Sequence, residues 1–310
     1  YLYDYVENGS WTLDKQIQLV PLFERDNGNS KQDKEGDIYG LISNDYISVD
    51  PYWSSCMVDI IKKNGDGDYE MVFDSAKLFD VCEKTMKLFF GCGNATYNIK
   101  HYGLDDEQND IREMFANGYA AMSTVRILEL EAGSIRNMEQ EFGVVPMPKF
   151  DEVQKEYRTL LHDQFTVFSI LTTVEKEEGR LDEVGAVLEA MSSESYKTVR
   201  PAYYEVMLTT RNVQDLESSE MLDLIFLHRT YDMGMYFTEL GFGNLFSDAY
   251  KTSVWYENFT SLELTSNDRN NILRIAVSQL GYHEGNGPEH CNGENCAGSG
   301  NYVEYNYYHG

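Results

Sequence analysis

The sequence is poor in basic residues and has no long apolar run. Its 310 residues include 25 Lys and Arg against 52 Asp and Glu, which gives a formal net charge of −27. Nucleic acids and anionic membranes are bound through clustered Lys and Arg, so this charge argues against both as partners. No window approaches the roughly 20 apolar residues that a transmembrane helix requires. The composition favours a soluble protein and says nothing about its ligand.

Cysteine is also scarce, and its spacing fits neither a disulfide framework nor a metal site. The cysteines are Cys56, Cys82, Cys92, Cys291 and Cys296. An odd number at irregular spacing is not typical of a disulfide scaffold. Cys82 shares a helical face with apolar residues, which predicts a buried thiol. Cys291 and Cys296 stand in a Gly-rich tail without the second close pair of ligands that structural zinc sites use, so we predict no metal.

Motifs of the common enzyme classes are missing too. There is no Walker phosphate loop, no G-x-S-x-G, no H-E-x-x-H and no Rossmann glycine fingerprint. The polar loop at 26–37 is rich in acids, but Gly28 and Lys31 break the register of a calcium loop. His228 has no evident acid–base partner in sequence, which favours a structural role. We therefore predict a protein without catalytic activity, cofactor or metal.

The residues that are present, 42% hydrophobic and 13% aromatic, are enough for a large core. Helical and strand periodicities alternate along the chain, which predicts an α/β fold. Thr12 is placed to cap a helix that Pro21 interrupts. The other expected elements are strands at 37–42, 120–126, 142–145 and 164–170, a turn at 63–68, and helices from Ser75, at 105–117, 180–191, 219–237 and 267–281.

Two of these strands flank a Pro-x-Pro exit. Phe142, Val144 and Val145 precede Pro146 and Pro148, and a polar crossing leads to the run at 164–170. Proline cannot donate to a strand ladder, so the first strand must stop there. A hinge between two lobes and an ordinary surface connection are both compatible with this pattern.

The segments EFGVVPMPKFDE and YRTLLHDQFTVFSI resemble the crossover of extracellular solute-binding proteins of the carbohydrate-uptake type, the capture subunits of ATP-driven importers. Four further stretches agree in order: LYDYVENGSWTLDK, GDIYGL, FANGYAAM and RPAYYEVMLTTRNVQDLESSEMLDLIF. The resemblance runs from Tyr1 to roughly Phe246. It implies a two-lobed, periplasmic-binding-protein-like fold of type II, a monomer, a membrane permease as partner, and a small-molecule or oligosaccharide ligand.

The resemblance also implies a division of the chain. Residues 1–265 would form the solute-binding region, with the second lobe at about 1–150 and 206–265 and part of the first lobe at about 160–205. Family members are exported, often as cell-surface lipoproteins, and no signal sequence opens this chain. We therefore expect a fragment whose first lobe is incomplete and exposes apolar surface.

Aromatic pairs follow two of the six prolines. Tyr52 and Trp53 follow Pro51, and Tyr203 and Tyr204 stand two and three residues after Pro201. Aromatic rings stack on the C–H faces of sugars. The stretch with Tyr52 and Trp53 resembles one that lends an aromatic to the cleft in the sugar-binding relatives, and Tyr203 and Tyr204 repeat its aromatic-after-proline arrangement. Packing within a lobe is an equally good interpretation of all four.

Polar candidates come from two other places. Residues just past the AAM stretch resemble a cleft wall, which makes Ser123, Thr124 and Arg126 ligand candidates. The fork of donors on Arg126 suits neighbouring hydroxyls, but an ion pair with Glu129 or Glu131 would occupy it equally well. Asp163 and Gln164, in the crossover, complete the predicted ligand-binding set.

The chain changes character at 266–310, where a helix leads into a Gly-rich tail. AVSQLGYHEG and GNYVEYNYYHG resemble the opening of a cysteine–histidine amidohydrolase/peptidase domain of cell-wall hydrolases. Neither Cys291 nor Cys296 matches the position of that family's nucleophile, so no catalytic pair is predicted here. The alternative to solute capture is that this chain is the recognition region of a peptidoglycan hydrolase whose catalytic Cys and His lie beyond residue 310.

Overall fold

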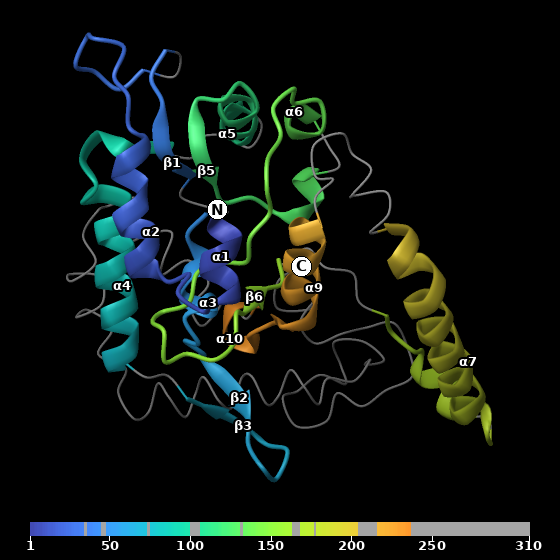
Figure 1. Cartoon of the computed structure of the whole chain (residues 1–310). Coiled ribbons are helices and arrows are strands. Elements are labelled where there is room, and N and C mark those ends of the chain that lie inside the picture. The colour runs from blue at the N-terminus through green and yellow to red at the C-terminus, as the bar shows by residue number, and fades with distance from the viewer. Residues whose placement is uncertain are drawn as a thin grey trace, which may run out of the picture. The chain divides into compact units, whose positions relative to one another are not determined.

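Figure 1 presents the computed structural model of the chain. The structure describes residues 1–33, 36–44, 48–72, 75–99, 106–130, 133–162, 168–176, 178–203 and 216–236. The chain forms two compact units, and it enters each of them more than once. Unit 1 comprises Tyr1–Lys62, Met71–Asp163 and Tyr204–Glu263, and unit 2 comprises Lys63–Glu70, Gln164–Tyr203 and Leu264–Gly310.

Unit 1 contains a three-stranded parallel sheet. Its order is β4 (Thr96–Ile99), β1 (Tyr39–Asn44) and β5 (Ala120–Ser123). Leu41 of the middle strand pairs with Thr96 on one side and with Met122 on the other. All six residues of β1 are buried, as is usual for a parallel strand covered on both faces. Helices and parallel strands together make this an α/β arrangement, as the sequence predicts.

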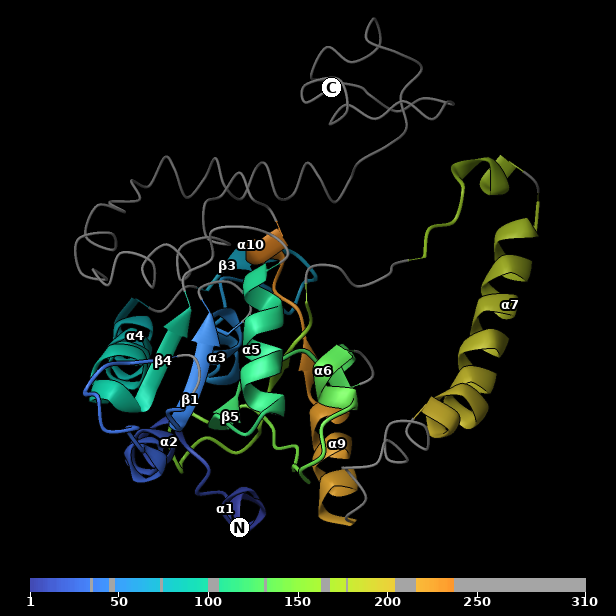
Figure 2. The ribbon, with the colours of Figure 1, turned by 90° about the horizontal axis from the view of Figure 1, so that it is seen from above.

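Helices carry the chain between the parallel strands, because a parallel pairing requires a crossover. The helix α4 (Ser75–Phe90) precedes β4, and α5 (Asp106–Ala116) precedes β5. In Figure 2, α4 lies beside β4 and α5 lies beside β5. One buried cluster joins Ile42 of the sheet to Ile111 and Met114 of α5, so apolar packing fixes this helix against the strands.

The N-terminal helices follow their local sequence signals. After α1 (Leu2–Glu7), the Thr12 hydroxyl accepts a hydrogen bond from Lys15 N at 3.2 Å and caps α2 (Leu13–Leu19). Pro21 then lies in the 3-10 turn η1 (Val20–Phe23) and not in the α-helix, as its missing amide hydrogen requires. The capping and the interruption predicted from the sequence are both confirmed.

One glycine allows η1 to approach the sheet. A Cβ atom on Gly40, within β1, would lie 1.9 Å from the backbone oxygen of Val20 and 2.6 Å from its carbonyl carbon. Both obstacles are backbone atoms, which cannot rotate away as a flexible side chain can. Position 40 therefore has room for glycine alone at this spacing.

Short elements complete the described part of unit 1. They are α3 (Asp50–Ser55), η2 (Gly93–Ala95), η3 (Ile127–Leu130), α6 (Gly133–Arg136), β6 (Thr159–Leu160), α9 (Leu216–Leu227), β7 (Arg229–Thr230) and α10 (Met233–Tyr236). Strand β6 pairs in parallel with β7. A hairpin of β2 (Ile61–Lys63) and β3 (Tyr69–Met71), of which Lys63–Glu70 belong to unit 2, has its turn at 64–68, as the sequence predicts. Cys56 and Cys82 are buried free thiols.

The predicted helix at 219–237 is wrong in its second half. The chain leaves α9 at Leu227, forms β7 and starts again as α10, where Asp232 accepts a hydrogen bond from Gly234 N at 2.8 Å. The same carboxylate accepts from the backbone nitrogens of Ile60 and Ile61. An aspartate that receives three backbone hydrogen bonds favours a new helix start over continuation.

The predicted strand at 142–145 is wrong as well. This segment has no strand partner among the described residues, and it is held by side-chain packing. Phe142 and Val144 contact a buried cluster that includes Leu130 and Leu222. The predicted strand at 120–126 is shorter than expected and ends at Ser123. Of the predicted strand at 164–170, residues 164–167 lie outside the described residues, and 168–170 are not a strand.

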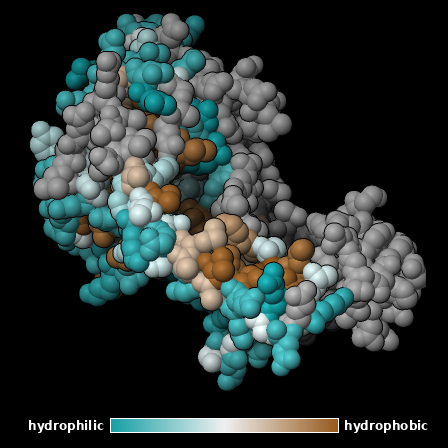
Figure 3. All heavy atoms as spheres, turned by 90° about the vertical axis from the view of Figure 1, so that its right-hand side faces the viewer, coloured by the Kyte–Doolittle hydropathy of each residue, from teal (hydrophilic) through white to brown (hydrophobic). Residues whose placement is uncertain are grey.

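The described part of unit 2 is mainly helical. It includes η4 (Thr172–Lys176) and α7 (Arg180–Glu194), which continues as the π-helical turn η5 (Ser195–Val199). None of the residues of α7 is buried, so the predicted inward packing of its apolar side is not found. Leu181 and Met191 are instead exposed, and Figure 3 shows apolar residues among hydrophilic ones at the molecular surface.

Candidate functional site

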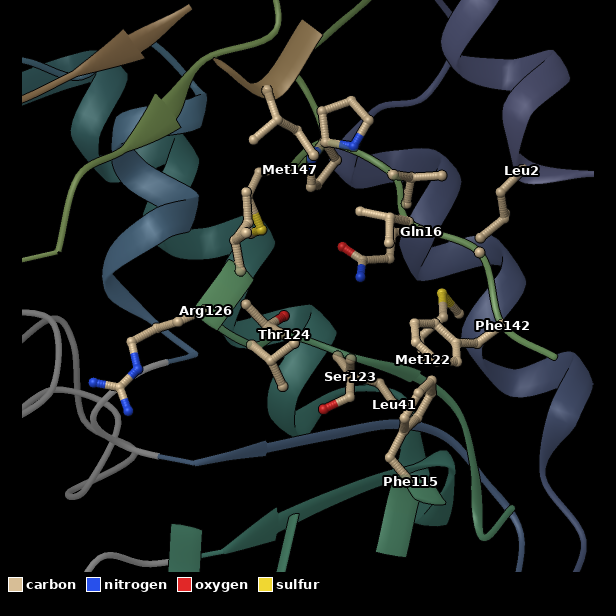
Figure 4. Close-up of a pocket in the computed structure, with 18 of the residues that line it drawn as sticks. Leu2, Gln16, Leu41, Phe115, Met122, Ser123, Thr124, Arg126, Phe142 and Met147 are labelled. Atoms are coloured by element: carbon tan, nitrogen blue, oxygen red, sulfur yellow. The ribbon is translucent and has the colours of Figure 1, made fainter. Parts of the chain in front are cut away.

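Unit 1 contains a cavity of about 190 Å³. One wall comes from β5 and the residues after it, and another comes from the Pro-x-Pro segment at 142–148. Figure 4 shows side chains from these walls and from α2 around the opening. Most lining residues are apolar. Water therefore forms few hydrogen bonds in the cavity, whereas a ligand with apolar surface is stabilised by burying that surface there.

Three of the predicted polar residues lie in this wall. Ser123, Thr124 and Arg126 all line the cavity, at the carboxyl end of β5. Ligands of open α/β sheets bind outside the carboxyl ends of strands, where backbone and loop side chains are free to point at them. The position of these residues is therefore one that suits binding.

Arg126 is held by a carboxylate, which is the alternative that the sequence left open for it. Its Nη2 lies 2.7 Å from Oε1 of Glu129, while Nε of Arg112 lies 2.6 Å from Oε2 of the same residue. The Glu129 side chain is only 5% exposed. Two arginines therefore compensate one buried carboxylate, and the guanidinium of Arg126 points away from the centre of the cavity (Figure 4).

Three polar side chains come together in the cavity wall, from α2, from α3 and from the residue after β5. The Tyr52 hydroxyl lies 3.3 Å from Oγ1 of Thr124, and the Gln16 side chain lies near the same hydroxyl. Burial raises the pKa of Tyr52 to about 12, although Thr124 and Gln16 both lower it. Tyr52 is therefore a neutral phenol at neutral pH, with the two polar side chains beside it.

The Pro-x-Pro segment is tied to the start of α2. Nε1 of Trp11 donates to the carbonyl oxygen of Pro146 at 2.8 Å. The backbones of Trp11 and Leu13 also exchange hydrogen bonds with Lys149 on the other side of the prolines. Trp11 is itself part of the cavity lining, so a displacement of the crossover segment would also move a residue of the cavity wall.

The predicted aromatic residues are placed differently from the polar ones. Tyr52 is fully buried and Trp53 is 1% exposed, so neither offers a free ring face for stacking in this structure. Their arrangement is packing within the fold, the second interpretation given above. Tyr203 belongs to unit 2 and is 36% exposed. Asp163, Gln164 and Tyr204 lie outside the described residues.

Gln16 is one of the polar lining residues that the sequence analysis missed. It lies on α2 between Leu13 and Val20, at the spacings that place all three on one helical face, and all three are buried. A glutamine on an otherwise apolar face is the sequence signal that was available. Its amide points into the cavity in Figure 4.

The described residues contain no group of three or more His, Cys, Asp or Glu side chains that could hold a metal ion. No helix within them is both long and apolar enough to cross a membrane. Comparison of the chain with protein families, with curated proteins and with solved structures finds no match.

Proposed function

We propose that this chain captures an extracellular carbohydrate or a related solute for an ATP-driven importer, by closure of two lobes around the ligand. The observation that carries the proposal is that Ser123, Thr124 and Arg126 meet the Pro-x-Pro segment around one cavity. The resemblance implied that the three residues belong to a cleft wall and that the Pro-x-Pro segment belongs to the crossover. The two stretches are separate in the sequence.

The organisation of the chain supports the same proposal. It enters each compact unit more than once, as the chain does in two-lobed binding proteins of type II. The α/β character and the location of the polar residues beyond the carboxyl end of β5 also suit this fold. The proposed protein is a cell-surface lipoprotein and a monomer that acts with a membrane permease and needs no cofactor.

The test is direct titration of the chain with a panel of neutral sugars and oligosaccharides by isothermal calorimetry. The variant Val144→Phe places a larger side chain in the cavity wall and should weaken solute binding at least about tenfold. Val187→Phe, on the exposed surface of α7, is the matched control and should bind as the unsubstituted chain does. Unchanged binding by Val144→Phe, or no binding of any solute, would overturn the proposal.

A further inference from the structure

Two polar atoms of the cavity wall have no hydrogen-bond partner within the described structure. They are Oε1 of Gln16 and Oγ of Ser123, and both atoms are buried. Buried polar groups in folded proteins are almost always paired, because an unpaired one has lost its hydration without compensation. These two atoms of the cavity wall are therefore candidates for hydrogen bonds to a bound molecule.

The identity of the Gln16 atom specifies what that molecule must provide. The unpaired atom of Gln16 is Oε1, the carbonyl oxygen of its amide. A carbonyl oxygen accepts only, so the ligand must present an N–H or O–H to it. The hydroxyl of Ser123 both donates and accepts, so it is suited to a carbonyl oxygen of the same ligand.

The charges and the size of the cavity further restrict the classes of ligand that it can bind. Arg126 is the one charged side chain among the described lining residues, and Glu129 already compensates it. No lining carboxylate is available for a cationic ligand, and no unpaired cation for an anionic one. At about 190 Å³ the cavity is smaller than the roughly 300 Å³ at which pockets for drug-sized ligands begin, so it suits one sugar unit or one substituent of it.

We propose that this cavity binds the N-acetyl group of a neutral amino sugar, an inference that rests on the proposed function. The amide N–H of the ligand donates to Oε1 of Gln16, its carbonyl accepts from the hydroxyl of Ser123, and its methyl group packs on apolar lining such as Met122. An acetamido group combines one donor, one acceptor and a methyl group, which is the combination that this wall offers. A plain hexose presents hydroxyls on every side, and the apolar walls would leave most of them unpaired.

The experiment compares N-acetylglucosamine, glucosamine and glucose by isothermal calorimetry on the same preparation of the chain. We expect N-acetylglucosamine to bind at least about tenfold tighter than the other two, since a polar site rejects ligands that leave its groups unpaired. Gln16→Met keeps the length of the side chain without its acceptor and should remove most of that preference. Gln18→Met, on the exposed side of α2, is the matched control and should retain it.

Each outcome has a separate meaning. Equal affinity for the three sugars overturns the N-acetyl inference and leaves solute capture standing. Binding of none of them, nor of any other solute of the panel, overturns both proposals. If Gln16→Met does not fold, Ser123→Ala removes the second unpaired atom by deleting a single oxygen. Full retention of the preference by the folded variant would contradict the assigned contacts.

Discussion

At the scale of single residues, burial separates two groups among the predicted ligand contacts. Ser123, Thr124 and Arg126 reach a cavity, whereas Tyr52 and Trp53 lie inside the fold. Tyr52 is part of the cavity wall, where its hydroxyl lies beside Thr124 and Gln16. Aromatic residues after a proline serve stacking and core packing equally well, because both uses exploit the same large apolar ring.

Trp53 provides the first test at this scale. Replacing it with Ala should lower the free energy of unfolding by about 3–5 kcal/mol, because a fully buried large side chain is lost and a space is left behind. Urea denaturation followed by circular dichroism measures the change. Phe168→Ala, at a site that is 81% exposed, is the matched aromatic control and should have little effect. A Trp53→Ala protein of unchanged stability but weakened sugar binding would restore the stacking role.

At the scale of the elements, local chemistry determined what was predictable. The cap at Thr12, the end of α5 before Gly118 and the turn at 64–68 all depend on neighbouring residues, and all were predicted. The break after Leu227 depends on Asp232 reaching Ile60 and Ile61, which are remote in sequence. Periodicity carries no information about such partners, so the split into α9, β7 and α10 was not predictable.

The candidate site also has a part that could be predicted from the sequence and a part that could not. Its polar edge at Ser123–Arg126 was expected from the resemblance, which also marked the segment with the two prolines as the crossover. The contribution of Gln16 depends on how α2 is docked against β5, which a single helix pattern does not specify. A polar residue on an otherwise apolar helical face can nevertheless be found in the sequence, and it marks a candidate polar contact within the fold.

Gly40 provides the test at the scale of elements. Gly40→Ala would force η1 away from β1, and it should lower the free energy of unfolding by more than about 3 kcal/mol or prevent folding. Thermal denaturation followed by circular dichroism measures the effect. Gly65→Ala is the control, because a Cβ at that exposed turn meets nothing within 4 Å. Equal melting temperatures for the two variants would show that Val20 moves aside at little cost.

At the scale of the whole molecule, the net charge of −27 sets the conditions under which the protein is stable. Carboxylates repel one another over a distance of about 10 Å at 0.1 M salt and farther when salt is low. The melting temperature should therefore rise by a few degrees when sodium chloride is increased from about 10 mM to 200 mM. Sucrose at matched osmolality is the control, because it does not screen charge. A melting temperature that falls with salt would contradict this expectation.

The strand order of the parallel sheet has a consequence for the order of events during synthesis. Leu41 of the middle strand finds its partners at Thr96 and Met122, and both are far along the chain. No hydrogen bond of this sheet can form while only the first strand has left the ribosome, and closing such long loops slows folding. Strand β1 therefore stays unpaired until β4 or β5 has been synthesised, and its apolar residues are exposed to solvent during that time.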